Sequence, residues 1–344
     1  MSIQIRPANL DSDGIALKEV LGRNLTTHSD LPRFNWLYRD GPHGAAHAWF
    51  AIDDGNGEIV GAGAAFPRRM YFDGNERVGL VFGDFCMDEK YRSLGPSLQL
   101  QRACMSAIAK GPFEFFYDFP SQGMTAIYRR LAVQPTEQLV RWVKPLRAEE
   151  KLERVIGSKR FASGLAPIAN FILARRGWRG NENACDLQLH EGLCGEEFTE
   201  LDELLRKRRG LSTARRAAFL NWRYFSNPGS RYQMLTARKA GRLLGYAVYT
   251  TSDKDSILVD LNSLDDPAVI TRLLHGAVEQ LRALGTAAVN LHAGNGHPWS
   301  LLFERAGFRR RESAPVVVQA RNGTAVSVAN FQRDWFLMHG DRDS

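Results

Sequence analysis

The sequence predicts a mixed α/β fold that occurs twice along the chain, and three observations carry this prediction. The segment FNWLYRDGPHG at residues 34–44 resembles FLNWRYFSNPGS at residues 219–230. Each copy precedes a strand-like apolar run, at 47–52 and 232–237, which leads through a turn into a second strand, as in a hairpin. The repeat distance is about half of the 344-residue chain, which is too long for a solenoid and fits a duplicated domain.

The remaining segments of each half follow in the same order: strand, helix, strand and short helix. In the first half they are residues 80–88, 97–109, 113–120 and 126–133, after an early helix at 15–22. In the second half they are residues 256–265, 267–284, 286–294 and 301–308. Antiparallel strands that lead into a β-α-β unit predict two tandem α/β domains, each with a mostly antiparallel sheet. We expect domains at 1–145 and 183–344, joined by a basic helical linker at 146–182.

The charge of the chain is concentrated in this linker. Of the net charge of +7, +6 lies between Lys144 and Gly180, where nine Lys and Arg residues accompany three acids. A basic charge confined to one segment, without a helix-turn-helix, RRM or zinc-finger pattern, argues against DNA as a partner. The apolar stretch at 165–178 ends in basic residues; we expect a helix packed between domains, with a membrane-surface helix as the alternative.

The cysteines and the apolar segments predict a cytoplasmic protein. The four cysteines form no CxxC pair, which favours free thiols in a reducing compartment over a disulfide scaffold or a zinc site. The first residues have no apolar signal core, and no window reaches the apolar length of a transmembrane helix. The hydrophobic and charged fractions, 44% and 24%, are those of an ordinary globular protein.

The stretch YRSLGPSLQLQ at residues 91–101 places a bare turn directly before an apolar helical run. The simplest interpretation is a turn in which proline begins a helix. The alternative is an anion site, because unpaired N–H groups at a helix N-terminus face a ligand beside the positive end of the helix dipole. Arg92 would add a fixed positive charge.

These motifs, together with the duplication, resemble those of the GCN5-related N-acetyltransferase superfamily. Its acyl-CoA motif, V-x-P-x-Y-R followed by [Q/R]-x-x-G-x-[G/A], resembles MDEKYR at 87–92 and RSLGPS at 92–97. Its helix N-x-x-A-x-x-L-Y-x-K-x-G-F loosely resembles SQGMTAIYRRLAV at 121–133. The second half has Phe303 in place of the tyrosine and lacks the arginine and glycine of the loop, so we expect it to be a degenerate copy that does not bind CoA in this way.

The resemblance implies that the free N–H groups of Ser93, Leu94, Gly95 and Ser97 hold the pyrophosphate of an acyl-CoA, with Arg92 nearby. Pro96 has no N–H to donate. Three interpretations remain open: the proline compensates by presetting the helix start, CoA binding is weaker, or the donor is another carrier with a phosphopantetheine arm. The strand at 81–87 is expected to splay from its neighbour, so that the Met87 N–H binds the acyl carbonyl. The residues implied to contact the donor are Met87, Arg92, Ser93, Leu94, Gly95, Pro96 and Ser97.

Three side chains are candidates for proton transfer. The tyrosine of the motif, Tyr128, is the expected general acid, because a hydroxyl with a pKa of about 10 can protonate a thiolate. Asp84 and Asp118 are the candidate bases, each with the alternative of a structural carboxylate that caps a strand or pairs with arginine.

Other candidates are expected to be structural. His43 and His47 have no third ligand, and the resemblance implies no metal. Cys86 lies near the expected thioester site, and a small buried thiol is favoured over a nucleophile. Trp36 and Trp222 occupy matching repeat positions, which favours core packing over ligand stacking.

The function that the resemblance implies is transfer of an acetyl or longer acyl group from acyl-CoA to a primary amine. Arg33, Arg68 and Arg69 suggest a small anionic acceptor, such as an acidic sugar, a nucleotide sugar or an amino acid. The alternatives are an enzyme fed by acyl carrier protein, which the basic linker could contact, a Fem-type transferase dependent on aminoacyl-tRNA, and a binding protein without catalysis.

Overall fold

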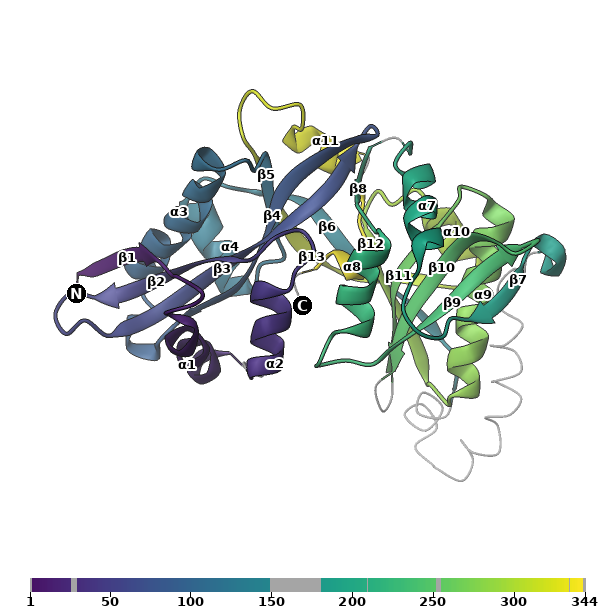
Figure 1. The fold of residues 1–344 in the computed structure, drawn as a ribbon, viewed down its shortest axis with the longest axis horizontal. Coiled ribbons are helices and arrows are strands. Elements are labelled where there is room, and N and C mark those ends of the chain that lie inside the picture. Colours follow the sequence, from purple (N-terminus) through teal and green to yellow (C-terminus); the bar gives the residue numbers. More distant parts are fainter. Residues whose placement is uncertain are drawn as a thin grey trace.

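The computed structural model describes residues 2–25, 30–148, 181–208, 210–251, 255–333 and 335–342. The expected helical linker at 146–182 falls almost wholly outside the described residues. The described parts form two α/β halves that lie next to each other (Figure 1). Among these residues, none of the helices combines the length and the apolar character that spanning a bilayer requires.

The first half contains the predicted strands and helices. Its elements are β1 (Ile3–Pro7), α1 (Gly14–Asn24), α2 (Leu31–Phe34), η1 (Asn35–Arg39), β2 (His47–Asp53), β3 (Ile59–Phe72), β4 (Asn75–Met87), η2 (Glu89–Tyr91), α3 (Leu94–Lys110), β5 (Phe115–Asp118), α4 (Gln122–Arg130) and β6 (Pro135–Pro145).

The second half repeats this order. Its elements are η3 (Glu182–Ala184), β7 (Asp186–Leu189), α7 (Glu196–Leu205), β8 (Leu211–Thr213), α8 (Ala217–Leu220), η4 (Asn221–Phe225), β9 (Tyr232–Lys239), β10 (Arg242–Thr251), β11 (Asp255–Ser263), α9 (Pro267–Ala283), β12 (Ala288–Gly294), α10 (Ser300–Arg305) and β13 (Arg309–Ala320). The chain then adds α11 (Val328–Arg333), β14 (Trp335–Phe336) and η5 (His339–Asp341).

Successive residues of strand β3 are buried. Because alternate side chains of a strand point to opposite sides of the sheet, both faces of β3 are covered. Ala62 and Ala64 pack in the same core as Leu17 and Val20 of α1. Ala65 belongs to a separate core with residues of α3. This explains why the glycine- and alanine-rich run of β3 is continuous rather than alternating with polar residues.

The two halves exchange their last strands. The strand order is β1-β2-β3-β4-β5-β13-β6-β12-β11-β10-β9-β7. Strand β13 from the second half pairs with β5 of the first, and β6 from the first half pairs with β12 of the second, both antiparallel. The exchanged strands also pair with each other, so one sheet continues across both halves (Figure 1). The mixed α/β class is confirmed; the boundaries at 145 and 183 stay a prediction.

The matching tryptophans of the repeat meet where the halves touch. The rings of Trp36 and Trp222 stack with centroids 5.1 Å apart. The Nε1–H of each ring donates to the backbone carbonyl of the other residue, at 2.7 Å in both directions. Both side chains are buried, which confirms the prediction that they pack in the core.

Candidate functional site

The site begins where two parallel strands separate. Strands β4 and β5 pair only over Gly79–Val81, although β4 continues to Met87. Beyond Val81, no other described strand pairs with the edge of β4 that faces β5. Opposite Ala62 and Ala64 of β3, the register of β4 shifts, as in a β-bulge. Within this bulge Asp84 adopts a left-handed conformation with φ of 47°, which is uncommon for a residue other than glycine.

A cavity of about 420 Å³ lies at the end of β4, beside the start of α3. Its lining residues are Asn24, Leu25, Phe85, Cys86, Met87, Arg92, Ser93, Ser97, Ser121, Gly123, Met124 and Ile127. The cavity therefore brings together four of the predicted donor-binding residues. We call it the donor cavity.

The helix at the donor cavity begins two residues before Pro96. The Ser97 N–H donates to the Ser93 carbonyl at 3.5 Å, so α3 starts at Leu94 and this amide belongs to the first helical turn. Proline at the third helical position removes no intrahelical bond, because the first amides of a helix have no partner within it. The groups with helix-start geometry for an anion are therefore the N–H groups of Ser93, Leu94 and Gly95. This corrects the expectation that the Ser97 N–H is free.

The turn before α3 is fixed by Arg92 and open at Gly95. The Arg92 side chain donates from Nε to the Met87 carbonyl at 3.0 Å and from Nη2 to Asn24 Oδ1 at 3.3 Å. A Cβ at Gly95 would meet no atom within 4 Å, so space lies in front of this residue. Asn24, which also donates to Asp88, was not predicted, because nothing in the sequence marks the end of α1 as part of the site.

A second cavity, of about 410 Å³, adjoins the first. We call it the acceptor cavity. Its lining residues are Leu25, Arg33, Ala64, Phe82, Gly83, Asp84, Phe85, Gln101, Cys104, Asp118, Phe119, Pro120, Ser121, Met124 and Arg342. Leu25, Phe85, Ser121 and Met124 line both cavities, so the two spaces share a wall in the gap between β4 and β5.

The motif tyrosine lies behind the wall of the acceptor cavity. The fully buried Tyr128 donates its hydroxyl to Asp118 Oδ2 at 2.7 Å and accepts a hydrogen bond from Gln101 Nε2 at 2.9 Å. Burial, and then the nearby Asp118 carboxylate, raises the pKa of Tyr128 well above its usual value. Asp118 and Gln101 line the cavity. Gln101 was not predicted. The sequence feature that could have indicated it is its position four residues after Ser97, on the same face of α3.

Asp84 is held in an ion pair. Arg33 donates to both of its carboxylate oxygens at 3.0 Å, and the Tyr38 hydroxyl donates to it at 2.9 Å. Burial and the Asp84 carboxylate raise the pKa of Tyr38. The structure thus places Asp84 at the cavity wall in the arginine pair that was the alternative to a role as base.

The other two arginines suggested for the acceptor lie away from this cavity. The buried Arg68 guanidinium lies over the rings of Phe219 and Trp222, at 5.4 and 5.5 Å from their centroids. Arg69 pairs with Glu76 at 2.8 Å. Arg342, from the C-terminal segment, lines the cavity instead.

Cys86 is a buried thiol at the wall of the donor cavity. Its Sγ lies 3.7 Å from the Val20 carbonyl, and burial raises its pKa to about 12. A thiol with such a pKa is a poor nucleophile near neutral pH. Within the described ranges, no three His, Cys, Asp or Glu side chains are grouped as a metal site would require.

The second half has the same fold in this region, but a carboxylate caps the helix start where an anion would bind. Helix α9 begins at Pro267, and the Asp266 side chain accepts the Ala268 N–H at 2.8 Å. A carboxylate at the helix start satisfies the amide that a phosphate would need and repels an anion. Phe303, at the position of Tyr128, is fully buried.

Comparisons with known proteins agree on the fold. No protein-family model matches the sequence, and no curated protein matches it significantly. A GCN5-related N-acetyltransferase from Anabaena variabilis is similar in structure, with a TM-score of 0.66 at 12% identity over 93% of this chain and 73% of that chain. One from Kribbella flavida gives 0.60 at 13% identity, over 92% and 71%.

The Saccharomyces cerevisiae N-myristoyltransferase with bound myristoyl-CoA gives a TM-score of 0.59 at 11% identity, over 98% of this chain and 89% of that chain. These similarities span nearly the whole chain at identities that speak for structure alone. The chain has the fold of the GCN5-related N-acetyltransferases.

Proposed function

We propose that the protein transfers an acyl group from acyl-CoA to a primary amine of a small acceptor. The observation that carries this proposal is the gap between β4 and β5. It joins a cavity at a helix start to a cavity lined by Asp118. The CoA arm would lie in the donor cavity and place its thioester in the gap. The amine would approach the thioester from the acceptor cavity.

In this proposal the donor cavity holds the CoA arm. The N–H groups of Ser93, Leu94 and Gly95 bind the pyrophosphate, and the Arg92 guanidinium adds positive charge beside them. The unpaired edge of β4 supplies N–H groups toward the thioester, with Met87 as the proposed donor to its carbonyl oxygen. Such donors stabilise the negative charge that develops on this oxygen in the transition state.

The reaction follows from the groups around the gap. The amine nitrogen attacks the carbonyl carbon, so the C–N bond forms, and the C–S bond then breaks to give the CoA thiolate. Asp118 accepts the proton that the amine loses and passes it to the thiolate. The Tyr128 hydroxyl, held protonated by its raised pKa, supports the Asp118 carboxylate from behind; the proposal thus routes its acid function through Asp118.

The test measures thiol release from acetyl-, octanoyl- and myristoyl-CoA with a panel of amines. Asp118→Asn should lower kcat by about 10²-fold or more, because a positioned base contributes about 10²–10⁴-fold. Asp84→Asn is the matched control: it removes the same charge from the same cavity wall. We expect it to lower stability through loss of the Arg33 pair and to change kcat less.

Equal losses of kcat in the two variants would show that Asp118 is not the specific base. Absence of transfer from every acyl-CoA, with transfer from an acylated carrier protein, would replace CoA as the donor. Binding of acyl-CoA without transfer to any amine would contradict catalysis and favour a binding protein.

A further inference from the structure

Arg342 is an arginine of the acceptor cavity without an acidic partner in the described chain. The cavity has two arginines in its wall, and Arg33 is committed to Asp84. Among the described residues, no carboxylate forms an ion pair with Arg342, and its Nε has no hydrogen-bond partner. Its guanidinium lies over the Phe119 ring, 5.4 Å from the centroid. A guanidinium at a cavity wall that has no acidic partner among the described residues can pair with an anionic ligand through charge-assisted hydrogen bonds.

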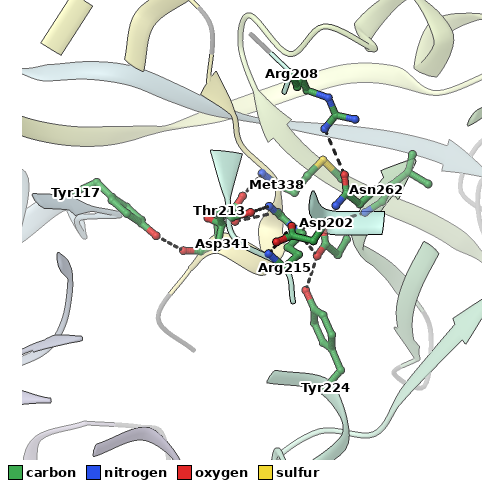
Figure 2. Close-up of polar contacts among 11 residues, drawn as sticks. Tyr117, Asp202, Arg208, Thr213, Arg215, Tyr224, Asn262, Met338 and Asp341 are labelled. Atoms are coloured by element: carbon green, nitrogen blue, oxygen red, sulfur yellow. Dashed lines mark hydrogen bonds and ion pairs between the residues drawn. The ribbon is translucent and has the colours of Figure 1, made fainter. Parts of the chain in front are cut away.

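The segment that carries Arg342 is fixed by a buried network, shown in Figure 2. The preceding residue, Asp341, accepts from Arg215 Nη2 at 2.9 Å and from the Met338 N–H at 2.7 Å. The Tyr117 hydroxyl donates to the Asp341 carbonyl at 3.0 Å, which ties this segment to β5 of the first half. The backbone therefore presents Arg342 in a set position beside the end of β5, the strand that also carries Asp118.

We infer that Arg342 binds an anionic group, a carboxylate or a phosphate, on the acceptor whose amine faces Asp118. This inference rests on the proposed acyl transfer and names the class of its acceptor. The planar guanidinium can hold either group with two parallel hydrogen bonds. A cavity of about 410 Å³ suits a small metabolite with both groups, such as an amino acid or an amino sugar phosphate.

The experiment compares amines that differ only in the anion. L-amino acids are assayed against their amides, and glucosamine 6-phosphate against glucosamine, with acetyl-CoA as donor. Each pair is measured with the wild type, Arg342→Gln and Arg342→Lys. Arg69→Gln is the matched control, because it removes the same charge from an arginine outside the cavity. Binding of the same amines to the CoA-saturated protein is measured by calorimetry, independently of turnover.

The wild type should prefer one anionic series by about 10- to 100-fold in kcat/KM, as expected for a charge-assisted bidentate pair. The preferred series distinguishes carboxylate from phosphate. Arg342→Gln should lose the preference, because the KM of the anionic amines rises toward that of the neutral amines. Arg342→Lys should regain part of the preference. Arg69→Gln should keep it.

The outcomes separate this inference from the proposed function. Turnover without an anion preference, or a preference that survives Arg342→Gln, overturns the inference and leaves acyl transfer in place. Binding of anionic amines that depends on Arg342, without turnover, supports the anion site and overturns the proposed catalysis. Neither binding nor turnover with any amine overturns both.

Discussion

A buried arginine of the second half, Arg215, gives the sharpest stability prediction. Arg215 is 1% exposed and donates to Asp260 at 2.9 and 3.2 Å. It also donates to Asp341 at 2.9 Å (Figure 2). Both carboxylates are fully buried. The substitution Arg215→Met replaces the arginine with an apolar side chain of similar length. It leaves two buried carboxylates without their cation.

The magnitude follows from what remains around each carboxylate. Asp260 would keep hydrogen bonds from the Tyr224 hydroxyl and the Leu261 N–H, and Asp341 would keep the Met338 N–H. Hydrogen bonds satisfy oxygen atoms but do not neutralise charge. Breaking a buried pair from one side costs about 3–5 kcal/mol, so we expect Arg215→Met to lower the free energy of unfolding by at least that amount.

The neighbouring arginine provides the control. Arg216 pairs with Glu76 at 2.8 Å and Glu203 at 3.2 Å, with a third of its side chain exposed. Solvent screens such pairs, so Arg216→Met should cost about 1 kcal/mol or less. Urea unfolding of both variants measures the difference. An Arg215→Met cost no larger than that of Arg216→Met would refute the reasoning.

Three further predictions concern packing, pH and the site. Trp36→Phe should cost about 1–3 kcal/mol in thermal unfolding, because a buried carbonyl of Trp222 loses its donor; a cost near zero would contradict the reciprocal pairing. Burial lowers the pKa of His297 to about 3, so only the unfolded chain binds its proton between about pH 3 and 6.5. Stability should therefore fall by about 2 kcal/mol from this group between pH 7 and 5 in urea melts, and His297→Gln should flatten the dependence. Tyr128→Phe should keep acyl-CoA binding and lower kcat about tenfold, because Asp118 loses a hydrogen bond; an unchanged kcat would make the tyrosine structural.

The repeated segments made most of the fold predictable. The copies around Trp36 and Trp222, and the strand and helix periods after them, locate elements that depend on local sequence. The exchange of β6 and β13 was not predictable in this way. Each exchanged strand follows its helix as it would in an unexchanged domain, and only tertiary pairing decides which half receives it.

The site residues likewise differ in whether local sequence or tertiary contacts determine their position. Arg92 and Gly95 lie in a contiguous motif and were predicted from it, and Asp118 was predicted as a strand end; Arg92 and Asp118 each line one of the two cavities. The pairing of Arg33 with Asp84 joins residues far apart in the chain, so the sequence favoured no partner for either. Arg342 reaches the cavity through the buried contacts of Asp341, which leave no local pattern.

The most direct test of the central claim is a calorimetric titration of acetyl-CoA into the wild type and Gly95→Trp. A Cβ at Gly95 meets open space, so the variant should fold and place its ring where the pyrophosphate would bind. Gly195→Trp, at the equally open start of α7, is the control. Micromolar binding that is lost only in Gly95→Trp is the predicted result. Equal binding by all three proteins, or no binding by the wild type, would contradict an acyl-CoA site at the start of α3.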